Sequence, residues 1–131
     1  MSSGDFSPNR SWVGKFRDAF RGVFQGVYGQ SSFAIHLPFA AAVVIAGAWF
    51  RISLNEWTLL TLSITLVLVA ELLNSAMELM ARAIDRSFNP LIGKSLDIAS
   101  GAVLLAAVGA VVVGFIVFLP RLSVLFGSLA G

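Results

Sequence analysis

Long apolar runs dominate the chain, and most polar residues fall between them. The runs cover about residues 35–54, 57–81 and 98–118. Each run is close to the ~20 apolar residues that a helix needs to cross the hydrocarbon core of a bilayer. A soluble three-helix bundle is the alternative, but its helices would each show a polar stripe, and the third run has none. The pattern therefore predicts an all-α membrane protein with three spanning helices.

A different pattern precedes the first apolar run. Over residues 11–28 the apolar positions recur every three or four residues, which is typical of an amphipathic helix. Because the opposite face carries basic residues, we expect this helix to lie along the membrane surface near anionic headgroups. Packing against a partner helix is the alternative. Residues 1–10 are expected to be disordered, and residues 123–131 are expected to form a tail after Pro120, which is predicted to close the third span.

Local signals indicate where the spanning helices begin and end. Trp49 and Trp57 lie on either side of a short polar turn, and tryptophan is enriched at membrane interfaces. Asn89 followed by Pro90 is typical of a helix N-cap and first turn, so the third helix is expected to begin ahead of its apolar run. His36, near the start of the first span, is interpreted as an interfacial residue rather than a ligand.

Composition and charge support the membrane prediction and orient the chain. Apolar residues make up 57% of the 131 residues and charged residues only 12%, whereas soluble domains carry about 25% charged residues. The net charge of +2 is too small to indicate a nucleic-acid partner. The positive-inside rule then predicts a multi-pass protein with a cytoplasmic N-terminus. The basic residues expected in the cytoplasm are Arg10, Lys15, Arg17, Arg21, Arg82, Arg86 and Lys94, and those expected outside are Arg51 and Arg121.

Three polar residues interrupt the second apolar run. Glu71, Asn74 and Glu78 stand at positions i, i+3 and i+7, so they share one face of a helix. Measured from Trp57, Glu71 lies about 21 Å along the helix, within the cytoplasmic leaflet, and Glu78 lies about 10 Å farther, near water. A charged side chain within a membrane costs at least a few kcal/mol (about 2.5–3.5 on insertion scales), so these acids indicate a functional site by default.

This polar face suits a substrate whose tail lies in lipid and whose hydroxyl group reaches the interface. A half-buried carboxylate such as Glu71 can act as the general base for that hydroxyl group. Glu78 could hold Mg²⁺, which prefers one or two carboxylates together with phosphate oxygens. Asp97 is expected at the same boundary, at the start of the third span. The structural alternatives are a hydrogen bond of Glu71 between subunits, an ion pair of Glu78 with Arg82, and an ion pair of Asp97 with Lys94.

Several motifs resemble those of the prokaryotic diacylglycerol kinase/undecaprenol kinase family. They are Glu71-Leu-Leu-Asn-Ser-Ala-Met-Glu78, Asp97-Ile-Ala-Ser-Gly-Ala-Val103 and Phe118-Leu-Pro-Arg121, and the likeness covers about residues 11–122. The resemblance implies a homotrimer in the bacterial inner membrane that phosphorylates a lipid alcohol with Mg²⁺ and ATP. Its active sites would lie at the boundary between membrane and cytosol and be shared between subunits. The ending at Arg121 and the segment Asn55-Glu-Trp57 resemble the undecaprenol kinase branch more than the diacylglycerol kinase branch.

The resemblance also implies roles for individual residues, carried over by matching position. Glu71 would be the general base, Asn74 would orient the reacting groups, and Ser100 would line the lipid side. The implied metal ligands are Glu78 and Gln30, and the implied nucleotide-binding residues are Asp97, Glu78 and Lys94.

Four positions depart from the residues that the family usually has. Gln30 stands where the family usually has a second metal-binding glutamate, and Ala34 stands where it usually has a basic residue. Arg82 replaces an acid, and Leu96 replaces a lysine. These departures leave a non-catalytic membrane oligomer of the same fold as the alternative to a kinase. A transporter with Glu71 as its proton carrier is less favoured, because this acid lies away from the midplane and no second acid marks an outer path.

Overall fold

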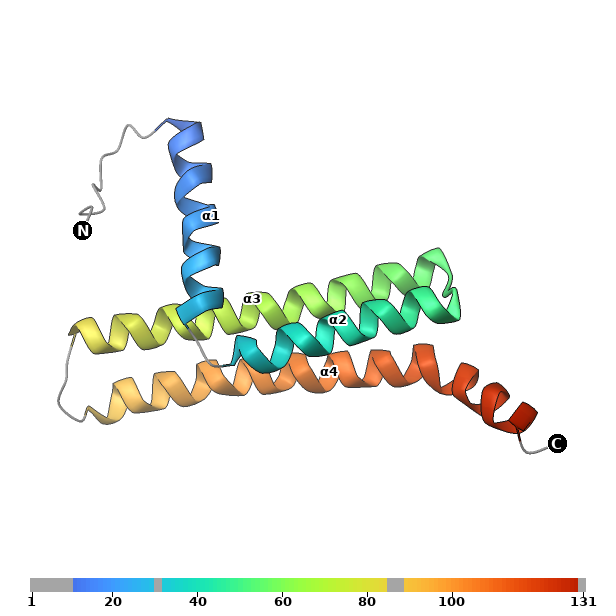
Figure 1. Cartoon of the computed structure of the whole chain (residues 1–131). Coiled ribbons are helices and arrows are strands. Elements are labelled where there is room, and N and C mark those ends of the chain that lie inside the picture. Colours follow the sequence, from blue (N-terminus) through green and yellow to red (C-terminus); the bar gives the residue numbers. More distant parts are fainter. Residues whose placement is uncertain (1–10, 30–31, 85–88, 130–131) are drawn as a thin grey trace.

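The computed structural model of the chain describes residues 11–29, 32–84 and 89–129, and four helices occupy nearly all of these ranges. The helices are α1 (Trp12–Gly29), α2 (Phe33–Phe50), α3 (Leu54–Ile84) and α4 (Pro90–Leu129). In Figure 1, α2, α3 and α4 run side by side, and α1 stands nearly at right angles to them. The three long helices are long and apolar enough to cross a membrane, which confirms the prediction of an all-α protein with three candidate spans. The predictions for residues 1–10 and for Gln30 fall outside the described residues.

The turn between α2 and α3 lies a few residues earlier in the chain than the predicted spans indicated. The first span ends at Phe50 rather than near residue 54, because Arg51 takes the left-handed conformation with φ 49°. The backbone N–H groups of Arg51 and Ile52 donate to the carbonyl oxygens of Ala48 and Gly47, at 3.3 and 3.2 Å. A left-handed residue followed by such bonds is a common way to satisfy the last carbonyl groups of a helix.

The start of α3 is fixed by a capping box and by an ion pair to α4. The Ser53 N–H donates to Glu56 Oε2 at 2.8 Å, and the Glu56 N–H donates to Ser53 Oγ at 3.3 Å, which is the reciprocal pattern of a capping box. The Arg121 guanidinium donates two hydrogen bonds of 2.7 Å to the same carboxylate and a third of 2.6 Å to the carbonyl oxygen of Val117. One side chain of α3 therefore closes its own helix and joins that helix to α4.

The small apolar core lies at this same end of the bundle. Ile52, Leu60 and Val117 are buried there and pack against partly buried neighbours that include Trp57. Elsewhere on the described helices most large apolar side chains are exposed in the single chain. Such exposure is expected of helices whose surroundings are acyl chains or other copies of the chain rather than water.

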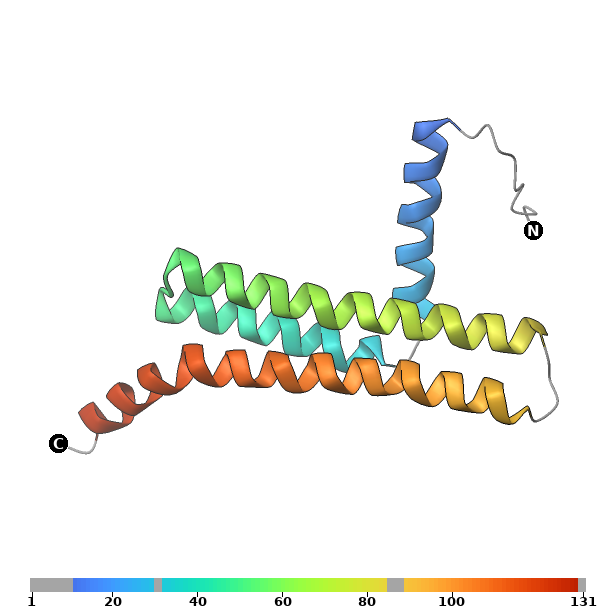
Figure 2. The same ribbon diagram turned by 180° about the vertical axis from the view of Figure 1, so that it is seen from behind.

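The prediction that Pro120 closes the third span is wrong, because α4 continues to Leu129. Proline lacks an N–H group and its ring crowds the carbonyl group four residues earlier, so a helix that contains it bends. In Figures 1 and 2 the C-terminal part of α4 turns away from the other two long helices. At the other end the prediction is confirmed: α4 begins at Pro90, and Asn89 Oδ1 accepts a 2.9 Å hydrogen bond from the Leu91 N–H.

Substitution of Gly47 should test how tightly the turn end is packed. A Cβ atom at Gly47 would lie 2.8 Å from the Trp57 ring and 3.1 Å from Ile52 Cδ1. Because the indole ring is rigid and surrounded, we expect Gly47→Ala to lower the free energy of unfolding by about 1–3 kcal/mol. Denaturation of the purified protein in detergent measures this change.

Gly127→Ala is the matched control, because a Cβ atom there meets nothing within 4 Å. We expect it to leave the stability unchanged or slightly higher, since alanine favours helix more than glycine does. Equal stability of the two variants would contradict the packing at Gly47.

Candidate active site

One face of α3 carries the polar residues that the sequence singled out. The helix is continuous from Leu54 to Ile84, so Glu71, Asn74 and Glu78 lie on one side of it, as predicted. The Asn74 amide donates a 3.1 Å hydrogen bond from Nδ2 to Glu78 Oε1. The Ser100 hydroxyl group, on α4, donates to Asn74 Oδ1 at 3.5 Å. Asn74 therefore connects the carboxylate of Glu78 with the neighbouring helix.

Glu71 is almost fully buried, and its partner is a residue that the sequence analysis did not select. The Glu71 side chain is only 5% exposed, and its Oε1 lies 2.9 Å from Nε2 of His36 on α2. At that distance an imidazole N–H donates a hydrogen bond to the carboxylate. His36 was expected to be a simple interfacial residue. Nothing in the local sequence indicated this contact, because it depends on how α2 packs against α3.

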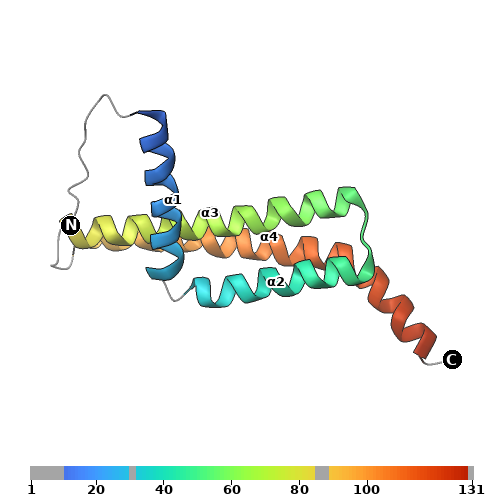
Figure 3. The same cartoon turned by 45° about the horizontal axis from the view of Figure 1, so that its top comes forward.

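The contact between α1 and α3 sets the level of Glu71 in the bundle. Gly26 of α1 lies against the Leu72 side chain, and a Cβ atom at this glycine would collide with it. In Figures 1 and 2 the C-terminal end of α1 meets α3 partway along its length, and α3 and α4 continue beyond it; Figure 3 shows the same arrangement from above. Because Leu72 follows Glu71 directly, Glu71 lies at the level of α1, and Glu78 lies about 10 Å farther along α3.

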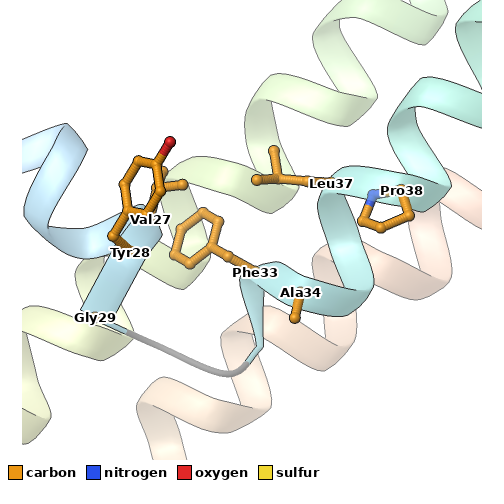
Figure 4. A pocket seen from close by; sticks show the side chains of 7 residues that line it. All are labelled: Val27, Tyr28, Gly29, Phe33, Ala34, Leu37 and Pro38. Carbon is orange, nitrogen blue, oxygen red and sulfur yellow. The ribbon is translucent and has the colours of Figure 1, made fainter.

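An apolar groove lies at the junction of α1 and α2, close to His36 in the chain. Its volume is about 540 Å³, and it is shallow and largely open. Figure 4 shows the residues that line it at the end of α1 and along the first turns of α2. The lining residues are Val27, Tyr28, Gly29, Phe33, Ala34, Leu37 and Pro38. A groove of this composition can hold part of a hydrocarbon chain.

The surroundings of Glu78 fit a divalent cation that arrives with phosphate groups. Glu78 is partly exposed, and the exposed Arg82 guanidinium lies 3.5 Å from its Oε2, as the structural alternative anticipated. Within the described ranges, no group of three or more His, Cys, Asp or Glu side chains could hold a metal ion by itself. Mg²⁺ needs only one or two carboxylates when phosphate oxygens complete its shell. The lone carboxylate of Glu78 could therefore hold such an ion only together with phosphate oxygens.

The two predicted nucleotide-binding residues of α4 stand apart from this cluster. Asp97 and Lys94 are both exposed, and neither side chain makes a hydrogen bond or ion pair with another residue among those that the structure describes. The expected alternative, an ion pair between them, is therefore not found. A single chain brings Glu71, Asn74, Glu78 and Ser100 together, but it leaves Asp97 and Lys94 facing outward.

Comparison with known proteins finds related sequences over most of the chain. A sequence model of the family described as "Prokaryotic diacylglycerol kinase" matches residues 17–118. The undecaprenol kinase of Bacillus subtilis (strain 168) is 32% identical over 122 residues, which are 90% of this chain and 99% of that protein. The diacylglycerol kinase of Synechocystis sp. is 37% identical over 82% of this chain and 62% of that protein. The diacylglycerol kinase of Escherichia coli (strain K12) is 35% identical over 78% of this chain and 77% of that protein.

The ion pair between Arg82 and Glu78 predicts a competition that can be measured without any enzymatic assay. Because Arg82 occupies one side of the carboxylate, we expect Arg82→Gln to raise the affinity for Mn²⁺, used as a spectroscopic substitute for Mg²⁺, by up to about fivefold. Electron paramagnetic resonance titration of the detergent-purified protein, with a non-hydrolysable ATP analogue present to supply the phosphate oxygens that a lone carboxylate needs, measures free and bound Mn²⁺. Glu78→Gln should remove the same binding. If Mn²⁺ affinity changes in neither variant, Glu78 is not a cation ligand.

Proposed function

The chain belongs to the prokaryotic diacylglycerol kinase family and is a membrane lipid kinase that uses ATP, and from this premise we propose that its acceptor is undecaprenol, with diacylglycerol as the alternative. The support for undecaprenol is the Bacillus subtilis relative, which matches this chain over 99% of its own length. The segments Asn55-Glu-Trp57 and Phe118-Leu-Pro-Arg121 support the same acceptor by resemblance. Both lipids present a hydroxyl group at the membrane surface and a long hydrocarbon tail below it.

The observation that carries the proposal is the buried carboxylate of Glu71 at the level where α1 crosses α3. A helix with one apolar and one basic face lies along the membrane surface, so a carboxylate at this level lies where a lipid hydroxyl group ends. The apolar groove between α1 and α2 is suited to receive the first part of the lipid tail. The lipid would thus approach from the membrane side, while Glu78 faces the watery side from which ATP arrives.

The proposed reaction moves one phosphoryl group and one proton. Glu71 accepts the proton of the lipid hydroxyl group, and the oxygen forms a bond to the γ-phosphorus of ATP as the bond to the leaving ADP oxygen breaks. Asn74 holds Glu78 and orients the reacting groups. Glu78 would hold Mg²⁺, and Gln30, which lies outside the described residues, is the second proposed ligand. When bound, the ion would neutralise charge on the phosphate oxygens, which is the main requirement of phosphoryl transfer.

The proposed nucleotide site includes Asp97 and Lys94 from a neighbouring copy. In the single chain these two side chains are exposed, and so are most large apolar side chains of the long helices, which leaves surface for neighbours. We therefore propose the homotrimer that the family resemblance implied, with each site built by two subunits. The same proposal places the N-terminus and the loop before α4 in the bacterial cytoplasm, because seven of the nine basic residues lie on that side. Ser100 would then line the site from the lipid side.

The role of Glu71 is tested by removing its charge while keeping its shape. Glu71→Gln cannot accept a proton, so we expect the rate of lipid phosphorylation to fall by about 10²–10⁴-fold, the usual contribution of a general base. The assay follows transfer of labelled phosphate from ATP into lipid in mixed micelles. Glu56→Gln is the matched control on the same helix, and its rate should equal that of the parent once stability is accounted for. A parental rate in Glu71→Gln would contradict the assignment of the base.

The acceptor is tested by direct competition between the two lipids. We expect undecaprenol at the same mole fraction as dioleoylglycerol to give the higher kcat/KM, because the chain resembles the undecaprenol kinase branch over nearly its whole length. Thin-layer separation of the labelled products measures both rates in one reaction. A higher kcat/KM for dioleoylglycerol would replace undecaprenol as the acceptor and leave the lipid kinase assignment intact.

A further inference from the structure

The contact between His36 and Glu71 links two spans at the proposed catalytic carboxylate. His36 lies on the second turn of α2, and Glu71 lies near the middle of α3. The two atoms that meet, His36 Nε2 and Glu71 Oε1, are 2.9 Å apart. The histidine side chain is 25% exposed and the glutamate side chain only 5%. The buried carboxylate of Glu71 therefore has a hydrogen-bond donor on one side, and that donor, His36, is partly exposed.

A carboxylate at this position needs a donor before it can act as a base. Burial in an apolar setting disfavours the charged form of a carboxylate unless hydrogen bonds replace the lost water. The other bond at this residue, from the Ser75 hydroxyl group at 2.8 Å, goes to the backbone carbonyl oxygen of Glu71 and leaves the carboxylate untouched. Among the described side chains, His36 is the hydrogen-bonding partner of that carboxylate.

The geometry also gives the two carboxylate oxygens of Glu71 different roles. With Oε1 occupied by the imidazole, the carboxylate cannot rotate freely, and Oε2 is left to accept the proton of a substrate. His36 directly precedes Leu37 and Pro38, which line the apolar groove. The segment that would hold the lipid tail therefore also holds the side chain that orients the base. Positioning of this kind matters because a misplacement of about 1 Å can cost about 10²-fold in rate.

We propose that His36 is a positioning residue of the phosphoryl transfer: its Nε2–H donor fixes the Glu71 carboxylate in the orientation that accepts the proton of the lipid hydroxyl group. The inference rests on the proposed function of Glu71 as the base. It assigns a role to a residue of α2 that acts through another side chain and does not touch the nucleotide. Loss of the donor should therefore lower kcat and leave the KM for ATP unchanged.

The decisive experiment compares two replacements that differ in the donor. His36→Leu fills a similar volume without an N–H group, and His36→Gln offers an amide N–H at a similar reach. We expect kcat of His36→Leu to fall by about 10–100-fold and kcat of His36→Gln to return to within about threefold of the parent. Phe39→Leu, one turn farther along α2 and exposed, is the control and should keep the parental rate. The substrates are ATP and mixed micelles containing undecaprenol or dioleoylglycerol.

Each outcome of this comparison bears on the inference. A parental kcat in His36→Leu, or a kcat in His36→Gln as low as that in His36→Leu, would overturn it, and so would an equal rise in the KM for ATP. If His36→Leu does not assemble, the result for His36→Gln alone tests the inference. Because this variant retains a donor, it must restore both the assembly and the rate. A parent chain that phosphorylates neither lipid would contradict the proposed function itself, and the inference would fall with it. An active parent with an unaffected His36→Leu would contradict the inference alone.

Discussion

The contact between His36 and Glu71 governs how the polar end of this molecule is organised. A carboxylate on a membrane helix is stable only where donors replace the water that it has lost. Here the donor comes from another span, so the position of α2 against α3 and the chemistry of Glu71 depend on each other. The contact between Gly26 and Leu72 brings α1 against α3 at the same level of the bundle. Three helices therefore meet at the level of the proposed base.

The two ends of the bundle differ in how tightly they are packed. At the turn between α2 and α3, the Ser53 capping box, the Arg121 ion pair and the buried Leu60 hold the helices together. At the other end, the polar face around Glu78 leaves side chains open to substrates. An end that binds and releases ligands is expected to be the less tightly packed one. The packed end thus fixes α3 against α4, and this packing keeps Asn74 and Ser100 close to each other.

The sequence predicted those features that depend on local pattern. Apolar run lengths gave the three spans, the Asn89-Pro90 pair gave the start of α4, and helical spacing put Glu71 and Glu78 on one face. It failed where distant segments decide the outcome. The partner of Glu71 lies 35 positions earlier in the chain, and periodicity within one helix carries no information about such a contact. Pro120 was misjudged because a proline bends an otherwise strongly apolar helix without necessarily ending it.

The four departures from the usual family residues move charges to other positions more than they change the net charge. Two cations are lost, at Ala34 and Leu96, and two anions are lost, at Gln30 and Arg82, where the replacement also adds a cation. Relative to the usual family residues, these four positions thus gain one positive charge in sum. Phosphoryl transfer depends chiefly on positive charge placed around the phosphate oxygens. Arg82 lies beside Glu78, so under the proposed function the added cation would stand close to the arriving phosphate groups.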